Sequence, residues 1–88
     1  MNVDIILETE MKIATAEDIG RIIKEKRKED GLTLLEAAAI CSVSYAFLSA
    51  LENGKATVRL NKVLQVANCL GLELAVNIRT WSTTGNET

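Results

Sequence analysis

Apolar residues in the first half of the chain recur at helical spacing. One stripe follows the positions i, i+3, i+4 and i+7, and it consists of Ile19, Ile22, Ile23 and the stem of Lys26. Thr15 and Asp18 have the spacing of a capping box, with aspartate in the usual glutamate position, and Gly31 provides a left-handed stop. The pattern therefore predicts a first helix from about Ala16 to Asp30.

Two short helices with a three-residue turn between them are predicted next. Thr33 and Glu36 form a second capping box before an alanine-rich run, which favours a helix as far as Cys41. Ser44 is suited to cap a third helix, which ends near Asn53 before a glycine. Two short helices joined by such a turn form a helix-turn-helix unit.

The hydrophobic period changes from 3.6 to 2 at Gly71. Before this glycine, one face of a predicted fourth helix is apolar and consists of Leu60, Val63, Leu64, Ala67 and Leu70. After it, alternate residues share one side of a predicted strand, namely Leu72, Leu74, Val76 and Ile78. Val3–Leu7 is a second, shorter run that favours a β-strand. The pattern thus predicts four helices, a C-terminal strand and a strand candidate near the start.

The chain has 88 residues and a mass of 9.6 kDa, which suits one small domain. A domain of this size buries about 60–65% of the surface that its unfolded chain exposes, so an exposed apolar face tends to find a partner. We divide the sequence into an N-terminal extension (1–12), a helix-turn-helix domain (13–71), a dimerisation strand (72–81) and a polar tail (82–88).

Composition indicates the class of protein and the cellular compartment that we expect. Hydrophobic residues make up 48% of the chain and charged residues 25%, which is typical of a globular protein. The longest unbroken apolar run, Ala37–Cys41, is too short to span a membrane, and no basic cluster precedes Ile5–Leu7 as a secretory signal would require. We therefore expect a cytoplasmic protein with no membrane partner, in which Cys41 and Cys69 are small core residues and not a disulfide.

Nothing in the sequence has the pattern of a catalytic site. The sequence contains no histidine, which removes the usual general base and the commonest metal ligand. No nucleophile is paired with a base among the remaining residues. We therefore expect no enzymatic activity, no cofactor and no metal site.

The net charge of −2 conceals an uneven distribution of charge. Residues 1–18 hold five acidic residues against Lys12, whereas residues 19–62 hold eight basic and five acidic ones. The stretch Lys55–Lys62 carries three basic residues and no acidic residue. Charge alone leaves open whether this stretch is a solvated surface or a contact to nucleic acid.

The predicted third helix carries the candidate surface for a nucleic acid. In DNA-binding helix-turn-helix units, the second helix of the unit enters the major groove with its N-terminal residues facing the bases. The outward face here consists of Ser44, Tyr45, Ala46, Ser49 and Ala50. No carboxylate interrupts this face before Glu52. Many helical bundles contain such a unit without binding DNA, so this feature alone does not decide the function.

Several spaced segments within residues 13–79 resemble the Cro/C1-type (XRE) helix-turn-helix family. The similar segments are Gly31–Thr33, Val43–Ser44, Phe47–Lys55, Thr57–Leu60 and Lys62–Leu64. Residues 47–74 are especially similar to HipB-like antitoxins. The resemblance implies a mainly all-α, lambda-repressor-like domain of four to five compact helices. It also implies a homodimeric, operator-binding repressor that neutralises a HipA-like kinase toxin encoded beside it.

The resemblance also implies roles for individual residues. Those that match positions of base contact are Ser44, Tyr45, Ala46 and Ser49. Those that match positions of phosphate contact are Thr33, Lys55, Thr57 and Arg59. Arg27 and Glu52 match a pair that ties the first helix to the recognition helix.

Four positions depart from the pattern of the family. Leu34 replaces a phosphate-binding glutamine, Leu35 replaces a polar residue, and Ala37 replaces a core leucine. Ser42 stands where a glycine normally makes the turn. Two interpretations follow: Leu34 or Leu35 fills the space left by Ala37, or the two leucines are exposed and form a protein-contact patch.

The predicted strand Leu72–Ile78 favours self-association. A lone strand leaves one row of backbone groups unpaired and an apolar face uncovered, and Val3–Leu7 is a short partner flanked by acidic residues. Antiparallel pairing with the same strand of a second copy solves both problems and gives a two-fold dimer. We expect Trp81 to cap this intermolecular sheet in preference to anchoring a toxin.

Three functions remain in competition on the sequence alone. The leading hypothesis is a DNA-binding antitoxin that represses its own operon. The alternatives are a standalone XRE-family transcriptional regulator and a toxin-binding module that has lost operator binding. Leu34 favours the last of these, and the acid-free stretch Lys55–Lys62 favours the first.

Overall fold

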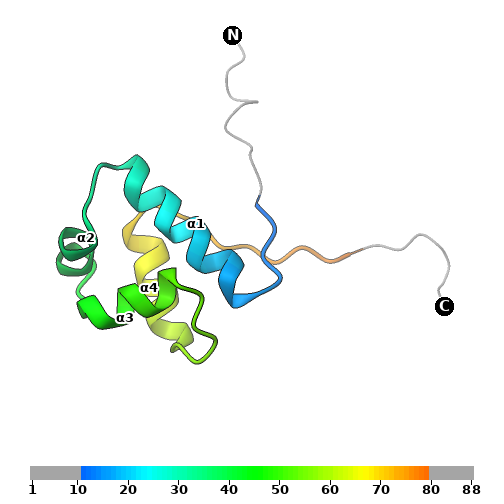
Figure 1. Ribbon diagram of the computed structural model, residues 1–88. Coiled ribbons are helices and arrows are strands. Elements are labelled where there is room, and N and C mark those ends of the chain that lie inside the picture. The colour runs from blue at the N-terminus through cyan, green and yellow to red at the C-terminus, as the bar shows by residue number, and fades with distance from the viewer. Residues whose placement is uncertain (1–10, 80–88) are drawn as a thin grey trace, which may run out of the picture.

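The computed structural model describes residues 11–79, which form four helices around one core (Figure 1). Their bounds are α1 (Ala16–Glu29), α2 (Leu34–Ile40), α3 (Tyr45–Glu52) and α4 (Leu60–Cys69). The predicted class, a compact and mainly α-helical domain, is confirmed. Each helix lies within one or two residues of its predicted bounds, because Asp30, Cys41 and Asn53 are C-caps that follow the last helical residue.

The two predicted capping boxes explain where α1 and α2 begin. The hydroxyl of Thr15 accepts a hydrogen bond from the backbone N–H of Asp18 at 3.1 Å, and the Asp18 carboxylate accepts one from the N–H of Thr15 at 3.0 Å. Thr33 and Glu36 make the same reciprocal pair, at 3.1 and 2.9 Å. Each box satisfies backbone donors that the first turn of a helix leaves free.

All four helices contribute side chains to the core. The largest fully buried side chains are Ile23, Leu48, Leu51 and Val66. The predicted stripe of α1 is confirmed, since Ile22 and Ile23 are buried and Ile19 packs against the core. Gly20 lets α1 approach α3 closely, because a Cβ at this position would overlap the backbone carbonyl of Leu51.

The predicted apolar face of α4 is wrong at two positions. Leu60 is 69% exposed and Leu64 is also exposed, whereas Val66, which the prediction omitted, is fully buried. Successive helical residues are rotated by about 100°, so a stripe centred on Val63 and Val66 turns Leu64 away from the core. Leu60 opens the helix at its N-terminal end, outside the core cluster.

The two leucines that depart from the family pattern behave differently. Ala37 is fully buried, and Leu34 is half-buried and packs against the same core. Leu35 is 66% exposed. Leu34 therefore supplies apolar volume beside the small Ala37, and Leu35 is available to a partner.

The two cysteines correct a prediction. Cys41, the C-cap of α2, and Cys69, the last residue of α4, are joined by a disulfide with their Cα atoms 5.6 Å apart. Cys41 lies in the core as expected, but the expectation of two unpaired thiols is wrong. The cysteines are 28 residues apart, and only the packing of α2 against α4 brings them together.

Residues 72–79 leave the end of α4 as an arm (Figure 1, orange). No strand is assigned within residues 11–79, and Val76 in this arm is 95% exposed. A strand that pairs only with a second copy requires that copy, so the predicted intermolecular sheet stays a prediction. The other strand candidate, Val3–Leu7, and Trp81 lie outside the described residues.

Across residues 11–79, no individual helix combines the length and the apolar character needed to cross a membrane. The helices α2 and α3 meet those criteria only when taken together, as a pair bent by 116°.

Candidate nucleic-acid interface

The helices α2 and α3 form the predicted helix-turn-helix unit, and the chain changes direction by 116° between them. Ser42 in the turn has a φ of 61°, the left-handed conformation that a glycine adopts without steric cost. The next residue, Val43, is half-buried and donates its backbone N–H to the carbonyl of Ala38 at 3.0 Å. The turn is therefore well defined although it lacks glycine.

A side chain from α4 holds the same turn. The Nε2 atom of Gln65 donates to the backbone carbonyls of Cys41 at 2.7 Å and Ser42 at 3.3 Å. Sequence reasoning missed Gln65 because its two acceptors lie 24 and 23 residues earlier in the chain. No local pattern marks such a contact.

The outward face of α3 is short, uncharged and largely accessible. Ser44 caps the helix, with its hydroxyl accepting the backbone N–H of Phe47 at 3.0 Å, and Ser44 itself is exposed. Tyr45 and Ala46 are also exposed. Ser49 is half-buried, and its hydroxyl lies 3.5 Å from the side-chain nitrogen of Asn53. Of the predicted base-contacting residues, Ser44, Tyr45 and Ala46 are thus exposed, and Ser49 is set deeper than the others.

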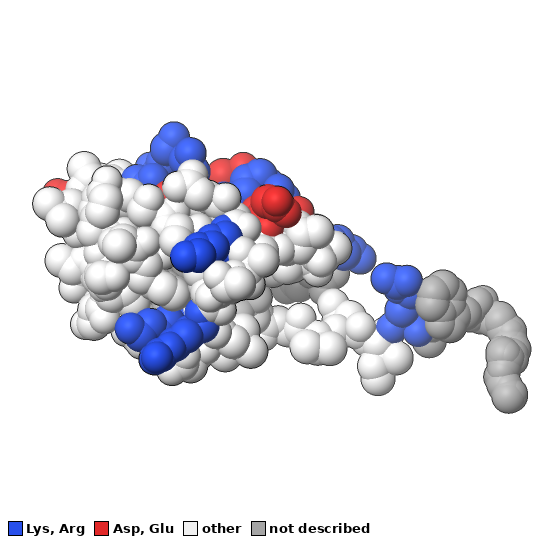
Figure 2. Space-filling view, turned by 60° about the horizontal axis from the view of Figure 1, so that its bottom comes forward, with Lys and Arg blue, Asp and Glu red and all other residues white. Residues whose placement is uncertain are grey.

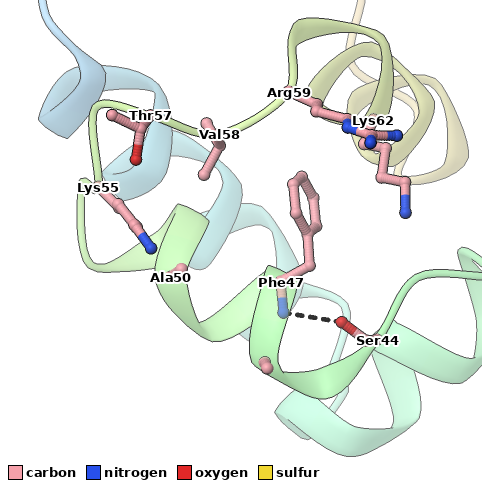
Figure 3. A pocket seen from close by; sticks show the side chains of 9 residues that line it. Ser44, Phe47, Ala50, Lys55, Thr57, Val58, Arg59 and Lys62 are labelled. Carbon is pink, nitrogen blue, oxygen red and sulfur yellow. Dashed lines mark hydrogen bonds between the residues drawn. The ribbon is translucent and has the colours of Figure 1, made fainter.

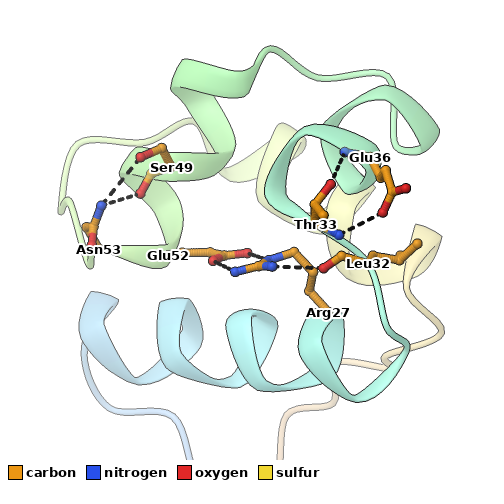
Figure 4. A network of polar contacts seen from close by, with 7 residues as sticks. All are labelled: Arg27, Leu32, Thr33, Glu36, Ser49, Glu52 and Asn53. Carbon is orange, nitrogen blue, oxygen red and sulfur yellow. Dashed lines mark hydrogen bonds and ion pairs between the residues drawn. The ribbon is translucent and has the colours of Figure 1, made fainter.

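An ion pair fixes α3 against α1, as the sequence predicts. The Nε and Nη2 atoms of Arg27 donate to the Glu52 carboxylate at 2.7 and 2.9 Å, and Nη1 donates to the Leu32 carbonyl at 2.9 Å (Figure 4). The two side chains are only 10% and 5% exposed. The hydrogen bonds to Glu52 raise the pKa of Arg27 above its usual value. A two-pronged contact of this kind fixes orientation as well as distance.

A groove of about 340 Å³ separates α3 from the segment that leads into α4 (Figure 3). Its lining residues are Ser44, Ala46, Phe47, Ala50, Lys55, Thr57, Val58, Arg59 and Lys62. Three of these carry positive charge and none carries negative charge. The Nζ atom of Lys62 lies 5.9 Å from the centre of the Phe47 ring, within reach of a cation–π interaction.

The groove brings together residues to which the sequence assigned two separate roles. Ser44 and Ala46 are candidates for base contact, whereas Lys55, Thr57 and Arg59 are candidates for phosphate contact. Lys62 joins them as a third cation, although the sequence assigned it no contact of its own. Its place over the Phe47 ring depends on tertiary packing.

Thr33 is the one predicted phosphate contact that lies outside the groove. Its hydroxyl and its backbone N–H are both engaged with Glu36 in the capping box. A phosphate at this helix end would meet the carboxylate of Glu36. Phosphate contact at Thr33 therefore requires Glu36 to move.

Acidic residues are scarce after α1, whereas α1 carries acidic and basic residues together. The helix α1 and its C-cap hold five acidic residues, namely Glu17, Asp18, Glu25, Glu29 and Asp30. From α2 to Lys62, the chain carries only two acidic residues, Glu36 and Glu52, and Glu52 is buried and paired with Arg27. Figure 2 shows basic side chains without acidic neighbours at the lower edge of one face, and basic and acidic side chains side by side near its upper edge. A cationic surface without acidic neighbours favours the approach of an anion.

The described part of the chain holds no group of three or more cysteine, aspartate or glutamate side chains placed to bind a metal ion.

A family model described as helix-turn-helix (HTH_3) matches residues 23–77 of the chain. Over 65 residues, the chain is 38% identical to the uncharacterized HTH-type transcriptional regulator y4mF of Sinorhizobium fredii. This match covers 74% of the chain and 86% of that relative.

Two solved structures are similar in fold. A chain in the structure of the HipA–HipB–O2–O3 complex superposes with a TM-score of 0.73, and one in the HipB–O4 20mer complex with a TM-score of 0.72. Both are 21% identical to this chain and cover 81% of it and 100% of their own length. At this identity, the similarity shows a shared fold.

Proposed function

Because this chain belongs to the helix-turn-helix family of DNA-binding transcription regulators, we propose that it is a homodimeric antitoxin that binds its own operator and neutralises a HipA-like kinase toxin. The observation that carries the DNA-binding part is the groove, where two candidates for base contact, Ser44 and Ala46, share one surface with three candidates for phosphate contact. The toxin partner is supported by the fold shared with HipB.

Two elements bind the DNA: the helix α3 contacts the bases, and the segment between α3 and α4 contacts the phosphates. The helix α3 enters the major groove with its N-terminal end leading, where Ser44, Tyr45 and Ser49 offer hydroxyls to base edges and Ala46 meets a thymine methyl. Lys55, Thr57 and Arg59 hold the flanking phosphates, which positions the protein without reading the sequence. The Arg27–Glu52 pair keeps α3 at the angle that both contacts need.

The dimer forms through the C-terminal arm. The arm, residues 11–14 and the apolar stripe of α1 (Ile19, Ile22 and Ile23) surround an open hollow of about 1290 Å³. Leu72, Leu74, Val76 and Ile78 of the arm all contribute to this hollow. The same arm of a second copy pairs antiparallel with this one, and its apolar side chains fill the hollow. The two recognition helices then face half-sites about 34–36 Å apart on the DNA.

The toxin contacts an exposed apolar part of α2. Leu35 and Ile40 are both largely exposed, at positions where a solvated helix usually carries polar residues. Leu34 is half-buried in the core, so its replacement of a phosphate-binding glutamine is explained by packing. A toxin-binding module without operator binding is therefore less well supported than the antitoxin that also binds DNA.

A standalone regulator is the second candidate function. It is favoured by the 38% identity to y4mF, which is named as a transcriptional regulator. The two candidates share every DNA-contacting residue. They differ in whether a kinase toxin binds the chain, and in whether that binding depends on Leu35 and Ile40.

The experiment is a salt series of fluorescence anisotropy with the DNA upstream of the protein's own gene. Phosphate contacts make the logarithm of affinity fall linearly with the logarithm of the salt concentration, so a steep slope with sequence preference is expected. A flat slope, or equal affinity for scrambled DNA, contradicts the proposal. Sedimentation of a chain cut after Gly71 tests the dimer, since a folded dimer without the arm places the interface elsewhere.

The toxin contact is tested by co-purification with the kinase encoded beside the gene. The variant Leu35→Lys is expected to lose the kinase but keep the affinity for DNA. Lys24→Gln, an exposed change on α1, is the matched control. If the wild-type chain and the kinase do not associate, the standalone regulator is the correct function.

A further inference from the structure

The disulfide Cys41–Cys69 lies at the helix-turn-helix unit, and nothing in DNA binding itself requires it. Cys41 ends α2 and is 3% exposed, whereas Cys69 ends α4 and is exposed. One sulfur therefore belongs to the core, and the other belongs to a residue on the surface. A thiolate from solution approaches such a bond from the side of Cys69.

The bond is attached directly to the turn that precedes the recognition helix. Cys41 is followed by Ser42 with its left-handed backbone, and two residues later Ser44 caps α3. Gln65, one helical turn before Cys69, donates hydrogen bonds to the carbonyls of Cys41 and Ser42. The helix α4 thus holds this turn through a covalent bond and a pair of hydrogen bonds.

We propose that Cys41–Cys69 is a thiol–disulfide exchange site whose redox state sets the affinity of α3 for DNA. The co-reactant is a low-molecular-weight thiol such as glutathione or the dithiol of a thioredoxin-type reductase. The site needs no further group from the protein. The part of the proposal that concerns DNA rests on the proposed function, and the part that concerns the turn does not.

The exchange proceeds in two balanced steps. A thiolate attacks the sulfur of Cys69, forms a mixed disulfide there and releases Cys41 as a thiolate, which takes a proton from water. A second thiolate then attacks the outer sulfur of the mixed disulfide and releases Cys69 as a thiolate. The protein disulfide gains two electrons, and two thiols become one disulfide. Oxidation by the disulfide form of the co-reactant is the reverse sequence.

Reduction changes what holds the turn. With the disulfide formed, the end of α2 cannot move away from α4, and the turn is preorganised for binding. With two thiols, the hydrogen bonds from Gln65 are the remaining side-chain restraint on the strained Ser42 among the described residues. The oxidised protein is therefore the form with higher affinity for DNA.

Thermodynamic linkage couples the oxidation of Cys41 and Cys69 to the binding of the operator. If oxidation tightens operator binding by some factor, operator binding must shift the equilibrium with glutathione toward the disulfide by the same factor. We expect a factor of at least about five, at the lower end of typical coupling between two sites. Both quantities, the change in DNA affinity on oxidation and the shift of the glutathione equilibrium on DNA binding, can be measured on the full-length chain.

The first measurement is the affinity of the full chain for its upstream DNA, in buffers poised with reduced and oxidised glutathione. The oxidised chain is expected to bind at least about fivefold more tightly than the reduced one. Cys69→Ser is expected to bind like the reduced wild type in both buffers. Equal affinities of the two wild-type forms, or a chain that forms no disulfide with oxidised glutathione, overturn the proposal.

The second measurement does not involve DNA. Hydrogen exchange of the Val43 amide, which is bonded to Ala38 in the turn, is expected to speed up on reduction. If neither form binds DNA but the exchange rate changes, the proposed function fails and the redox control of the turn stands. If the exchange rate is the same in both forms, the disulfide does not control the turn and the inference fails.

A third measurement tests which sulfur is attacked. Iodoacetamide is expected to alkylate Cys69 rapidly in the Cys41→Ser variant and Cys41 slowly in the Cys69→Ser variant, since only Cys69 is exposed. Equal rates in the two folded variants contradict attack at Cys69.

Discussion

Arg27 and Glu52 make a buried, two-pronged ion pair across 25 residues of sequence, with donor–acceptor distances of 2.7 and 2.9 Å. The pair joins the last turn of α1 to the last residue of α3. A third hydrogen bond, from Arg27 to the carbonyl of Leu32, ties in the segment that begins the helix-turn-helix unit. One guanidinium therefore sets the position of both functional helices relative to α1.

Removal of one partner of this pair should be costly. Arg27→Met leaves the Glu52 carboxylate buried without a counter-charge, which we expect to lower the free energy of unfolding by about 3–5 kcal/mol. Urea denaturation at pH 7 measures the loss. The double variant Arg27→Met, Glu52→Leu should recover much of it, because no charge is then left unpaired. A single variant as stable as the wild type would show that the pair has no structural role.

The recognition face should respond to changes in a sequence-specific way. Tyr45→Ala and Ser49→Ala each remove a group offered to a base edge, so we expect a loss of about 1–3 kcal/mol in operator binding for each true base contact. Selectivity over scrambled DNA should fall as well. Anisotropy with both DNAs measures this, and Ala39→Ser on α2 serves as an exposed control. Unchanged affinity and selectivity in the double variant would exclude this face.

The cations of the groove should behave differently from the recognition face. Lys55→Gln and Arg59→Gln are expected to weaken binding to all sequences alike, and to reduce the salt slope by about one for each phosphate that the variant no longer binds. Lys62→Gln tests the cation that lies over Phe47 in the same way. Lys24→Gln is the control, because it removes one positive charge in the same way but lies on α1, outside the groove. A fall in selectivity with an unchanged slope would assign these residues to base recognition instead.

The turn should gain stability from glycine. An L-residue in the left-handed conformation costs roughly 1–2 kcal/mol, whereas the greater flexibility of glycine in the unfolded chain costs roughly 0.5–1 kcal/mol. Ser42→Gly is therefore expected to raise the free energy of unfolding by about 0.5 kcal/mol. Ser42→Val, with a branched side chain at the same φ, should lower it. Thermal melts of both variants under one redox condition give the comparison.

The N-terminal cap of α1 should make stability depend on acid pH. Hydrogen bonds from the backbone N–H groups of Ala14 and Thr15 hold the pKa of Asp18 below its usual value. A lowered pKa means that the charged form stabilises the folded state above the unfolded-state pKa, and that this contribution is lost as the pH falls from about 4 through the folded pKa. Asp18→Asn should therefore be less stable than the wild type at pH 6, and the difference should shrink below about pH 4. Glu17→Gln is the control from the same turn, and a difference that persists at pH 2 would contradict the linkage.

Short-range chemistry let the sequence alone determine the helices. The capping pairs Thr15–Asp18 and Thr33–Glu36 are three residues apart, so their hydrogen bonds depend on local backbone geometry alone. The same holds for the apolar stripe of α1 and for the N-cap Ser44. These interactions set where each helix begins, and with the turn between α2 and α3 they define the helix-turn-helix unit.

Only the tertiary structure decided which side chains meet across the helices. The buried face of α4, the different fates of Leu34 and Leu35, and the meeting of Cys41 with Cys69 all depend on how α4 packs against the other helices. The Gln65 contact depends on the same packing and joins residues more than 20 positions apart. Each helix offers several nearly equivalent apolar faces, and close packing selects one of them from the shapes of all its neighbours together. The hydrophobic pattern along the chain does not contain the shapes of those neighbouring helices. The sequence therefore determined the helices, and the packing determined the contacts between them.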